Sequence, residues 1–318
     1  MAWTLEEYID HLESRQDLIW PQPPRLERPK AKPFLKPLSD VRAVLWDVYG
    51  VLIRITDGRL MVFHPQKLRM EVALEKTIKE FKMWNSMVRK PGAPWEYMLQ
   101  QYKDLFDAYS MAPTPAKGDV AHVSSERIWR RLIERLMQKE YAWDEATLGT
   151  LEELSRKVAY FFHGMLQGSE AADALPVLEK LKKAGFLQGI LSDSQFFTPL
   201  QLLRLFRRRG TLPSLDAIWQ PELVVFSHQA GLRKPSPTLL KTTVQRLKDV
   251  GLKPREVAYV SCRVGGDLAV ARQFGLRTIL YAGDKSSLQA TPSEVRDPQT
   301  RPDRLITDFV QLLHVLPV

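Results

Sequence analysis

The stretch Ala43-Val44-Leu45-Trp46-Asp47-Val48-Tyr49-Gly50-Val51-Leu52 decides how the rest of this chain is interpreted. An apolar run ends in Asp47, and Gly50 follows three residues later, where a tight turn is expected. Open α/β sheets present reactive groups in this way, with a buried strand that delivers a carboxylate at its carboxyl end. Asp47 is therefore the first candidate for chemistry, as a nucleophile, and Tyr49 is its unusual neighbour.

The composition is that of an ordinary globular protein with room for about two domains. Of the 318 residues, 44% are hydrophobic and 26% are charged. No run approaches the roughly 20 apolar residues of a membrane span, and the first residues lack the pattern of a secretion signal. A single cysteine excludes an intrachain disulfide framework and suits a reducing compartment. We therefore expect a cytoplasmic protein without a membrane partner.

The net charge of +9 favours acidic ligands. The basic residues are nevertheless spread along the chain and mixed with acids. Such mixing indicates a solvated surface rather than a nucleic-acid footprint. The expected partner is therefore a small anionic molecule and not a nucleic acid.

The chain is expected to form a leader, a core and an insert. Residues 1–40 form a leader whose prolines prevent regular structure, which predicts an extended arm or a flexible tail. Residues 65–168 carry apolar residues at helical spacing and predict an all-helical insert. Residues 41–64 and 169–318 form the core, where alternating strands and helices predict an α/β fold with a doubly wound parallel sheet. Because the insert separates the first strand from the others, we expect it to cap the strand ends.

A β-hairpin is predicted directly after the first strand. Asp57-Gly58 lies between two β-prone runs within residues 53–63. An Asp-Gly pair in that setting is a strong signal for a two-residue turn between antiparallel strands.

Reactive side chains occur at four places where a doubly wound sheet presents functional groups. Asp47 supplies a carboxylate, and Ser192 supplies a hydroxyl at the end of an apolar strand. Lys234 supplies an ammonium group just before a proline-started helix, and Asp267 supplies a second acid after a glycine-rich turn. In aspartyl covalent catalysis the carboxylate attacks, the hydroxyl and ammonium hold the anion, and the second acid steadies the lysine or a metal. Each residue alone has a simpler interpretation, such as a helix cap or a surface lysine, but their order and spacing indicate one site.

With these residues in this order, the chain resembles the haloacid dehalogenase superfamily over about residues 42–315. Residues 47–52 match the first family motif, Ser192 the second, 231–237 the third, and 267–275 the second half of the fourth. The predicted hairpin lies where the family has its flap, and the insert lies where it has a helical cap. The resemblance implies a hydrolase with an aspartate nucleophile.

The resemblance and the residue chemistry together assign a role to each position. Catalysis is assigned to Asp47, Tyr49, Ser192 and Lys234, substrate binding to Gly50, Asp193, Ser261 and Cys262, and a Mg²⁺ ion, if one binds, to Asp47 and Asp267.

Several positions depart from the pattern of the family's phosphatases. Tyr49 stands where these enzymes carry an acid that protonates the leaving group, and a tyrosine of ordinary pKa is a poor base near neutrality. Ser261 and Cys262 replace a Gly-Asp pair, which removes one expected Mg²⁺ carboxylate. Tyr49 and Ser261 are typical of the family's metal-free dehalogenases, whereas Val264 replaces the asparagine that such enzymes have in the fourth motif.

These departures leave three functions open. The favoured one is hydrolysis of a small anionic substrate, with a phosphate ester ahead of other substrates. The alternatives are a metal-independent 2-haloacid dehalogenase and a catalytically silent binding protein. Cys262 is either a redox-sensitive or activated thiol, or a small buried residue that fills the space of the lost aspartate.

Overall fold

The computed structural model describes residues 2–87, 92–316 and 318. The chain forms two compact units. A helical unit contains Met1–Gln22, Met61–Ala112 and Val123–Gly168, and an α/β unit contains Pro23–Leu60, Pro113–His122 and Ser169–Val318.

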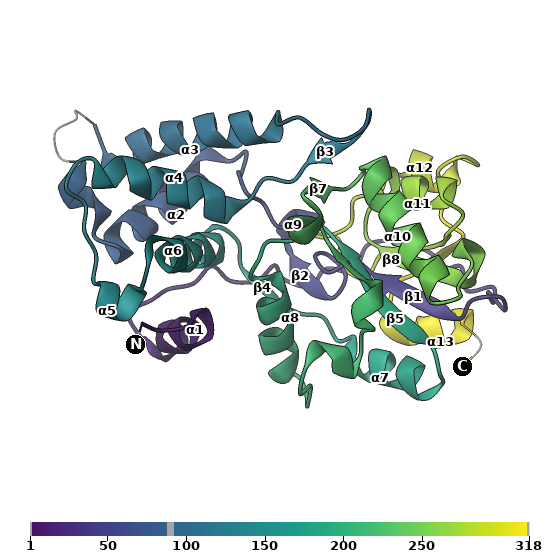
Figure 1. The fold of residues 1–318 in the computed structure, drawn as a ribbon. Helices are drawn as coiled ribbons and strands as arrows, with labels where there is room; N and C mark the ends of the chain where they lie inside the picture. The colour runs from purple at the N-terminus through teal and green to yellow at the C-terminus, as the bar shows by residue number, and fades with distance from the viewer. Residues whose placement is uncertain (1, 88–91, 317) are drawn as a thin grey trace. The chain divides into compact units, whose positions relative to one another are not determined.

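The α/β unit is built on a six-stranded sheet whose order is β10-β9-β8-β1-β5-β6, with every neighbouring pair parallel (Figure 1). The predicted doubly wound α/β fold is therefore confirmed. The strands are β1 (Ala43–Trp46), β5 (Leu187–Ser192), β6 (Val224–Phe226), β8 (Val257–Ser261), β9 (Arg277–Tyr281) and β10 (Arg304–Ile306). The helices are α7 (Leu175–Lys183), α8 (Thr198–Arg207), α9 (Ser227–Ala230), α10 (Pro237–Asp249), α11 (Ala269–Gln273), α12 (Pro292–Arg296) and α13 (Leu312–Val315).

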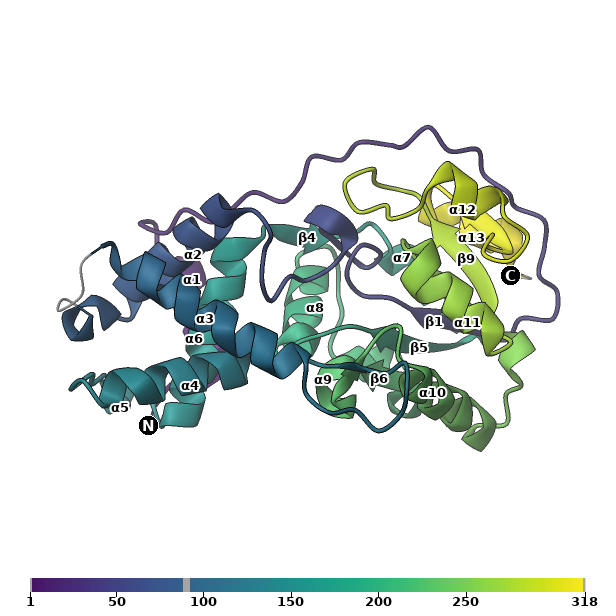
Figure 2. The same ribbon diagram turned by 90° about the horizontal axis from the view of Figure 1, so that it is seen from above.

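Both faces of this sheet are buried. Val44 and Trp46 of β1 pack into a core with α7, α8 and α13, whereas Ala43 and Leu45 pack into a second core with α10 and α11. Figure 1 shows α10 and α11 above the sheet and α7 and α13 below it, and Figure 2 shows the same layers from above. Because side chains alternate between the faces and both faces are covered, the central strands consist almost entirely of apolar residues.

The helical unit has a core of aromatic rings. Tyr102, Trp129 and Phe162 have ring centroids 5.1–5.7 Å apart. These residues lie on three different helices, so their contacts set how the helices pack. The helices are α1 (Leu5–Ser14), α2 (Lys67–Glu80), α3 (Pro94–Ser110), α4 (Ser125–Met137), α5 (Glu145–Leu148) and α6 (Leu151–Leu166). Among the described residues, no helix combines the length and apolar composition that a bilayer span requires.

The units differ from the expected boundaries in the leader, at residues 61–64 and at residues 113–122. Residues 23–40 of the leader belong with the α/β unit, and residues 61–64, expected in the core, belong with the helical unit. The start of the leader forms α1, and Trp20 packs edge-on against Phe161 with centroids 5.6 Å apart, so residues 1–22 belong with the helical unit. Residues 113–122, expected in the insert, belong with the α/β unit. They include β3 (Val120–Ala121), which pairs antiparallel with β7 (Leu232–Arg233).

The predicted hairpin is wrong. Strand β2 (Ile53–Ile55) pairs antiparallel with the distant β4 (Ser169–Ala171) rather than with residues 59–63. Asp57 and Gly58 do adopt the positive φ values of a tight turn, 63° and 61°. The predicted tight turn is therefore present, but a local turn does not decide which strand supplies the hydrogen-bond partner.

A single glycine in β5 offers a test of this packing. A Cβ atom at Gly189 would lie 2.4 Å from the carbonyl oxygen of Leu223 and 2.7 Å from Cδ2 of Leu45. We expect Gly189→Ala to lower the free energy of unfolding by about 1–3 kcal/mol, because the sheet has no room for the added methyl group. Urea denaturation measures the change.

Gly266→Ala is the matched control, since a Cβ there meets nothing within 4 Å. Equal stability of the two variants would contradict the close packing of β5 against β1.

Candidate active site

Asp47 follows the last residue of β1 and is 1% exposed. Its Oδ1 accepts hydrogen bonds from the Ser192 hydroxyl at 2.8 Å and from the Val48 amide at 3.0 Å. Ser192 is the last residue of the neighbouring strand β5, so the parallel pairing of β1 and β5 brings the two side chains together.

Lys234 joins the two acids that the sequence singled out. Its Nζ lies 2.7 Å from Oδ2 of Asp47 and 2.8 Å from Oδ2 of Asp267. The Tyr259 hydroxyl accepts a third hydrogen bond from the same ammonium group at 2.8 Å. Lys234 precedes α10 and Asp267 lies in the turn after β8, so residues far apart in sequence meet at the carboxyl edge of the sheet.

Arg263 is a central member of the site, although the sequence did not single it out. Its Nε lies 3.2 Å from Oδ2 of Asp267, and its Nη2 lies 3.4 Å from Oδ2 of Asp193 and 3.6 Å from Oδ2 of Asp47. The available signal was the spacing of four residues between Arg263 and Asp267. That spacing suggests an ion pair within one helical turn but does not reveal the contact with Asp47.

Two buried acids therefore face two cations, the buried Lys234 and the partly buried Arg263. Burial raises the pKa of Asp47, and the charge of Asp267 adds to the rise although Lys234 opposes it. Burial also acts to raise the pKa of Asp267, but Arg263 and Lys234 outweigh it and hold that pKa below its usual range. For Lys234, burial favours a lower pKa, yet the two carboxylates raise it. The formal charges of the four groups cancel, which is what makes their burial tolerable.

Ser261 and Asp193 complete the polar surroundings. The Ser261 hydroxyl lies 2.6 Å from Oδ2 of Asp267 and 3.2 Å from Oδ2 of Asp47. It has one proton and can donate to only one of these oxygens at a time. Oδ1 of Asp193 accepts from the Lys234 backbone amide at 2.8 Å, so Asp193 also fixes the loop that carries the lysine.

The Tyr49 hydroxyl is held at α8. It donates to Oε1 of Gln201 at 2.7 Å and shares a hydrogen bond of 2.9 Å with the Thr198 hydroxyl. These bonds connect the turn after β1 to the start of α8. They place Tyr49 as an anchor of that turn, away from the role of leaving-group acid.

Cys262 and Gly50 pack against each other. The thiol is fully buried, with Sγ 4.0 Å from the Tyr49 carbonyl oxygen and 3.8 Å from that of Gly58. A Cβ at Gly50, where φ is +85°, would lie 2.4 Å from that sulfur. Burial raises the pKa of Cys262 to about 12, so the thiol is protonated at neutral pH. This environment suits the space-filling interpretation rather than an activated thiol.

Mg²⁺ does not fit the donors present here. It prefers carboxylate oxygens and water, and no group of three or more His, Cys, Asp or Glu side chains among the described residues could hold a metal ion. Oδ2 of Asp47 and Oδ2 of Asp267 both accept from Lys234. Among the described residues the one buried carboxylate oxygen without a hydrogen-bond partner is Oδ1 of Asp267. One open carboxylate oxygen is too few to offset two resident side-chain cations.

A second polar group that the sequence did not indicate lies at the ends of β5 and β6. The Ser194 hydroxyl lies 2.8 Å from Nδ1 of His228, and the Ser227 hydroxyl lies 3.2 Å from Nδ1 of His122. Burial lowers the pKa of each histidine to about 4. Both rings are therefore neutral at pH 7. His122 belongs to the stretch expected in the helical insert, which is why its position could not be predicted.

Comparisons with known proteins match parts of this chain. The model of a family described as HAD-hydrolase-like matches residues 231–312, which contain Lys234, Arg263 and Asp267. A glyceraldehyde 3-phosphate phosphatase from Pyrococcus furiosus is 30% identical over 149 residues, or 46% of this chain. That match covers 54% of the phosphatase, so the chain spans about half the length of this curated relative.

One solved structure shares the fold, and a second resembles the chain less closely. A 2-haloacid dehalogenase from Pseudomonas syringae has a TM-score of 0.52 and 21% identity, with 86% of this chain and 96% of that chain covered. A HAD phosphatase from Thermococcus onnurineus has a TM-score of 0.46 and 15% identity, with coverage of 86% and 96%.

The buried cluster predicts that Arg263 matters for stability. We expect Arg263→Gln to lower the free energy of unfolding at pH 7 by about 3 kcal/mol, because removing one partner leaves buried carboxylates uncompensated. The matched control is Arg209→Gln, whose guanidinium is 42% exposed and pairs with Glu170 and Asp173; we expect less than about 1 kcal/mol. Urea denaturation compares the two.

The same variant has a defined pH signature. The pKa of Asp267 is lower in the folded state, so its stabilising contribution is present above the unfolded value of about 3.9 and is lost as pH falls below it. Arg263→Gln removes part of that contribution. The difference in the free energy of unfolding between this variant and the wild-type protein should therefore shrink below about pH 4. A difference independent of pH would contradict the ion-pair account.

Proposed function

We propose that this chain, a member of the haloacid dehalogenase superfamily, hydrolyses a small anionic substrate by covalent attack of Asp47, with Lys234 and Arg263 in the charge-neutralising role that a divalent metal would otherwise fill. The observation that carries the proposal is the contact of both cations with the Asp47 carboxylate at the carboxyl edge of the sheet.

The residues support the following sequence of steps. Lys234 stabilises the ionised form of Asp47, which attacks phosphorus to form an acyl phosphate, or carbon to form an ester, as the bond to the leaving group breaks. The two cations stabilise the negative charge that develops on the substrate. Water then hydrolyses this intermediate, releases phosphate from the acyl phosphate or a hydroxy acid from the ester, and restores the Asp47 carboxylate.

A phosphate ester is the favoured substrate. The curated relative that matches part of the chain is a phosphatase, which supports this choice. The position that would protonate the leaving group holds Tyr49, whose hydroxyl is bonded at α8. Lost acid catalysis lowers a rate by about 10²–10⁴-fold. The substrate is therefore expected to have a leaving group that departs without a proton, such as a carboxylate or a phenolate.

A 2-haloacid is the second candidate substrate, because halide also leaves without a proton.

The third interpretation, a silent binding protein, is favoured by one observation. Both oxygens of the Asp47 carboxylate accept hydrogen bonds, and the residue is 1% exposed. Turnover therefore requires Ser192 or Lys234 to release the carboxylate, and a protein in which they never do so would bind without reacting.

A substrate panel separates these functions. We expect aryl and acyl phosphates to be hydrolysed at least about 100-fold faster than alkyl phosphates, because no acid assists the leaving group. The rate should be the same with Mg²⁺ and with a chelator, and Asp47→Asn should abolish it. Phosphate release and halide release from short 2-haloacids are measured side by side.

Asp173→Asn, whose side chain is 82% exposed, is the control for Asp47→Asn. Loss of phosphatase activity with chelator would overturn the role of the two cations. Halide release without phosphate release would favour the dehalogenase, and no turnover of either panel would favour the silent protein.

The activity should also depend on pH. Asp47 must be ionised to attack, and burial raises its pKa. We expect kcat/KM on an aryl phosphate to fall as pH is lowered through a value above the ordinary aspartate pKa of about 3.9. An acid limb at or below that value would contradict Asp47 as the buried nucleophile.

A further inference from the structure

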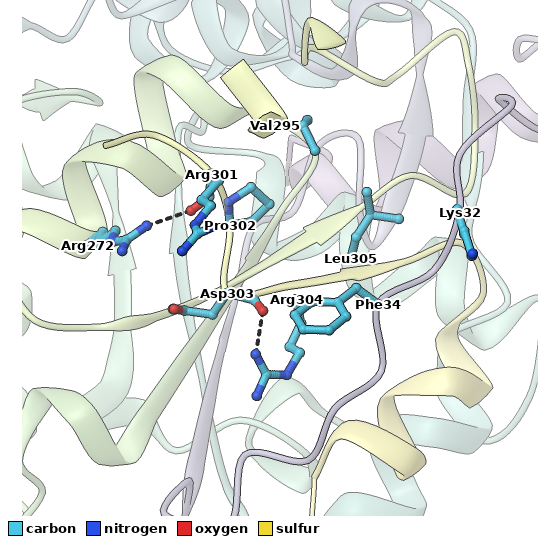
Figure 3. Close-up of a pocket in the computed structure, with 9 residues that line it drawn as sticks. All are labelled: Lys32, Phe34, Arg272, Val295, Arg301, Pro302, Asp303, Arg304 and Leu305. Atoms are coloured by element: carbon cyan, nitrogen blue, oxygen red, sulfur yellow. Dashed lines mark hydrogen bonds between the residues drawn. The ribbon is translucent and has the colours of Figure 1, made fainter. Parts of the chain in front are cut away.

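A pocket of about 420 Å³ lies at the start of β10, and the proposed chemistry does not use it. Pockets for small molecules span roughly 300–1,000 Å³, so the size suits a metabolite. Figure 3 shows that side chains from separate parts of the chain line it. They are Lys32 and Phe34 of the leader, Arg272 at the end of α11, and Val295, Arg301, Pro302, Asp303, Arg304 and Leu305.

The pocket and the proposed active site lie at opposite edges of the sheet. Asp47 follows the last residue of β1, whereas Arg304 is the first residue of β10. Because the strands are parallel, the pocket lies at the amino edge, beside the outermost strand. A ligand bound there does not contact the catalytic residues.

The leader builds one wall of the pocket. Phe34 pairs with Leu305 through two backbone hydrogen bonds, of 2.9 Å and 3.3 Å, and so adds to the edge of β10. The Arg304 guanidinium lies 5.0 Å from the Phe34 ring centroid and donates to the Pro37 carbonyl at 3.0 Å. The ring is thereby fixed in place while the residue remains 53% exposed.

The lining carries uncompensated positive charge. Lys32, Arg272, Arg301 and Arg304 contribute four cations and Asp303 one carboxylate. Oδ2 of Asp303 accepts from the Thr278 amide at 2.9 Å and from its hydroxyl at 3.1 Å, which ties the acid to β9. Within the described chain none of the four cations has a carboxylate at ion-pair distance. Arg272 instead donates to the Arg301 carbonyl at 2.7 Å, a bond drawn in Figure 3.

We propose that this pocket binds a nucleotide, with phosphate groups on Lys32, Arg272 and Arg301 and a planar base against the exposed ring of Phe34. Guanidinium groups match phosphate oxygens in geometry as well as in charge. An aromatic ring fixed by a cation on one side gives a rigid surface on which a base stacks. Several cations beside one exposed ring favour a ligand that carries both phosphate groups and a planar base.

Calorimetric titration of the full-length protein tests the site, with ADP as the probe and a chelator present. We expect saturable ADP binding with a Kd below 1 mM that weakens as salt rises. Pyrophosphate, which lacks the ring, and adenosine, which lacks the phosphates, should each bind at least about tenfold more weakly. Lys32→Glu and Arg301→Glu should each weaken ADP binding by about tenfold or more.

Matched variants separate the contribution of the Phe34 ring to ADP binding from that of the charges. Phe34→Leu retains the backbone pairing with Leu305, so it should weaken ADP towards the affinity of pyrophosphate and leave pyrophosphate unchanged. Lys183→Glu reverses a charge on α7 away from the pocket and should leave ADP affinity unchanged. Arg263→Gln, which alters the proposed active site, should also leave it unchanged.

Three results would overturn the proposal. These are the absence of saturable ADP binding, equal ADP affinity in Arg301→Glu and the wild-type protein, and pyrophosphate binding as tight as that of ADP. Loss of ADP binding in Arg263→Gln with retention in Arg301→Glu would place the nucleotide at the catalytic edge instead. Circular dichroism of each variant confirms that the fold is intact.

Discussion

The buried contact between Lys234 and two carboxylates is the interaction on which the rest of the α/β unit depends. One ammonium group lies within 2.8 Å of Asp47 and Asp267, which follow the two adjacent central strands β1 and β8. An unpaired charge at this depth is strongly destabilising, so each group requires the others in place. The loop before α10 and the turn after β8 are therefore positioned by electrostatics as well as by packing.

The same contact sets the chemistry that the site can perform. Lys234 and Arg263 balance the charges of the two acids, and they lie beside the Asp47 oxygen that attacks in the proposed reaction. Side-chain cations on fixed backbone are preorganised for one distribution of charge, which is how enzymes stabilise charge that develops in a transition state. They also hold the resting carboxylate tightly, so stability and reactivity compete at Asp47.

Different parts of the leader contact different parts of the protein. Its first part packs with the helical unit through α1 and Trp20, and its later part pairs with β10 through Phe34. An edge strand exposes unpaired backbone groups, and Phe34 satisfies two of them. The proline-rich composition predicts an extended segment, and in the structure that segment makes defined contacts.

Much of the fold and part of the site could be predicted from the sequence. The apolar runs that became β1, β5 and β8 were recognisable because a strand buried on both faces has few polar residues, and the polar residues that follow or end these strands identified Asp47, Ser192 and Asp267. These are local properties of composition and spacing. By themselves they established the α/β class and the order of the reactive groups along the chain.

Tertiary structure alone decided which residues meet. The partner of β2 is 114 residues or more away in sequence, and Arg263 reaches Asp47 and Asp193 across loops that no local pattern relates. The direction of the Tyr49 hydroxyl depends on Thr198 and Gln201, and the position of His122 depends on the pairing of β3 with β7. Periodicity reports only how a segment is buried, whereas partners are chosen by the packing and charge balance of the whole unit.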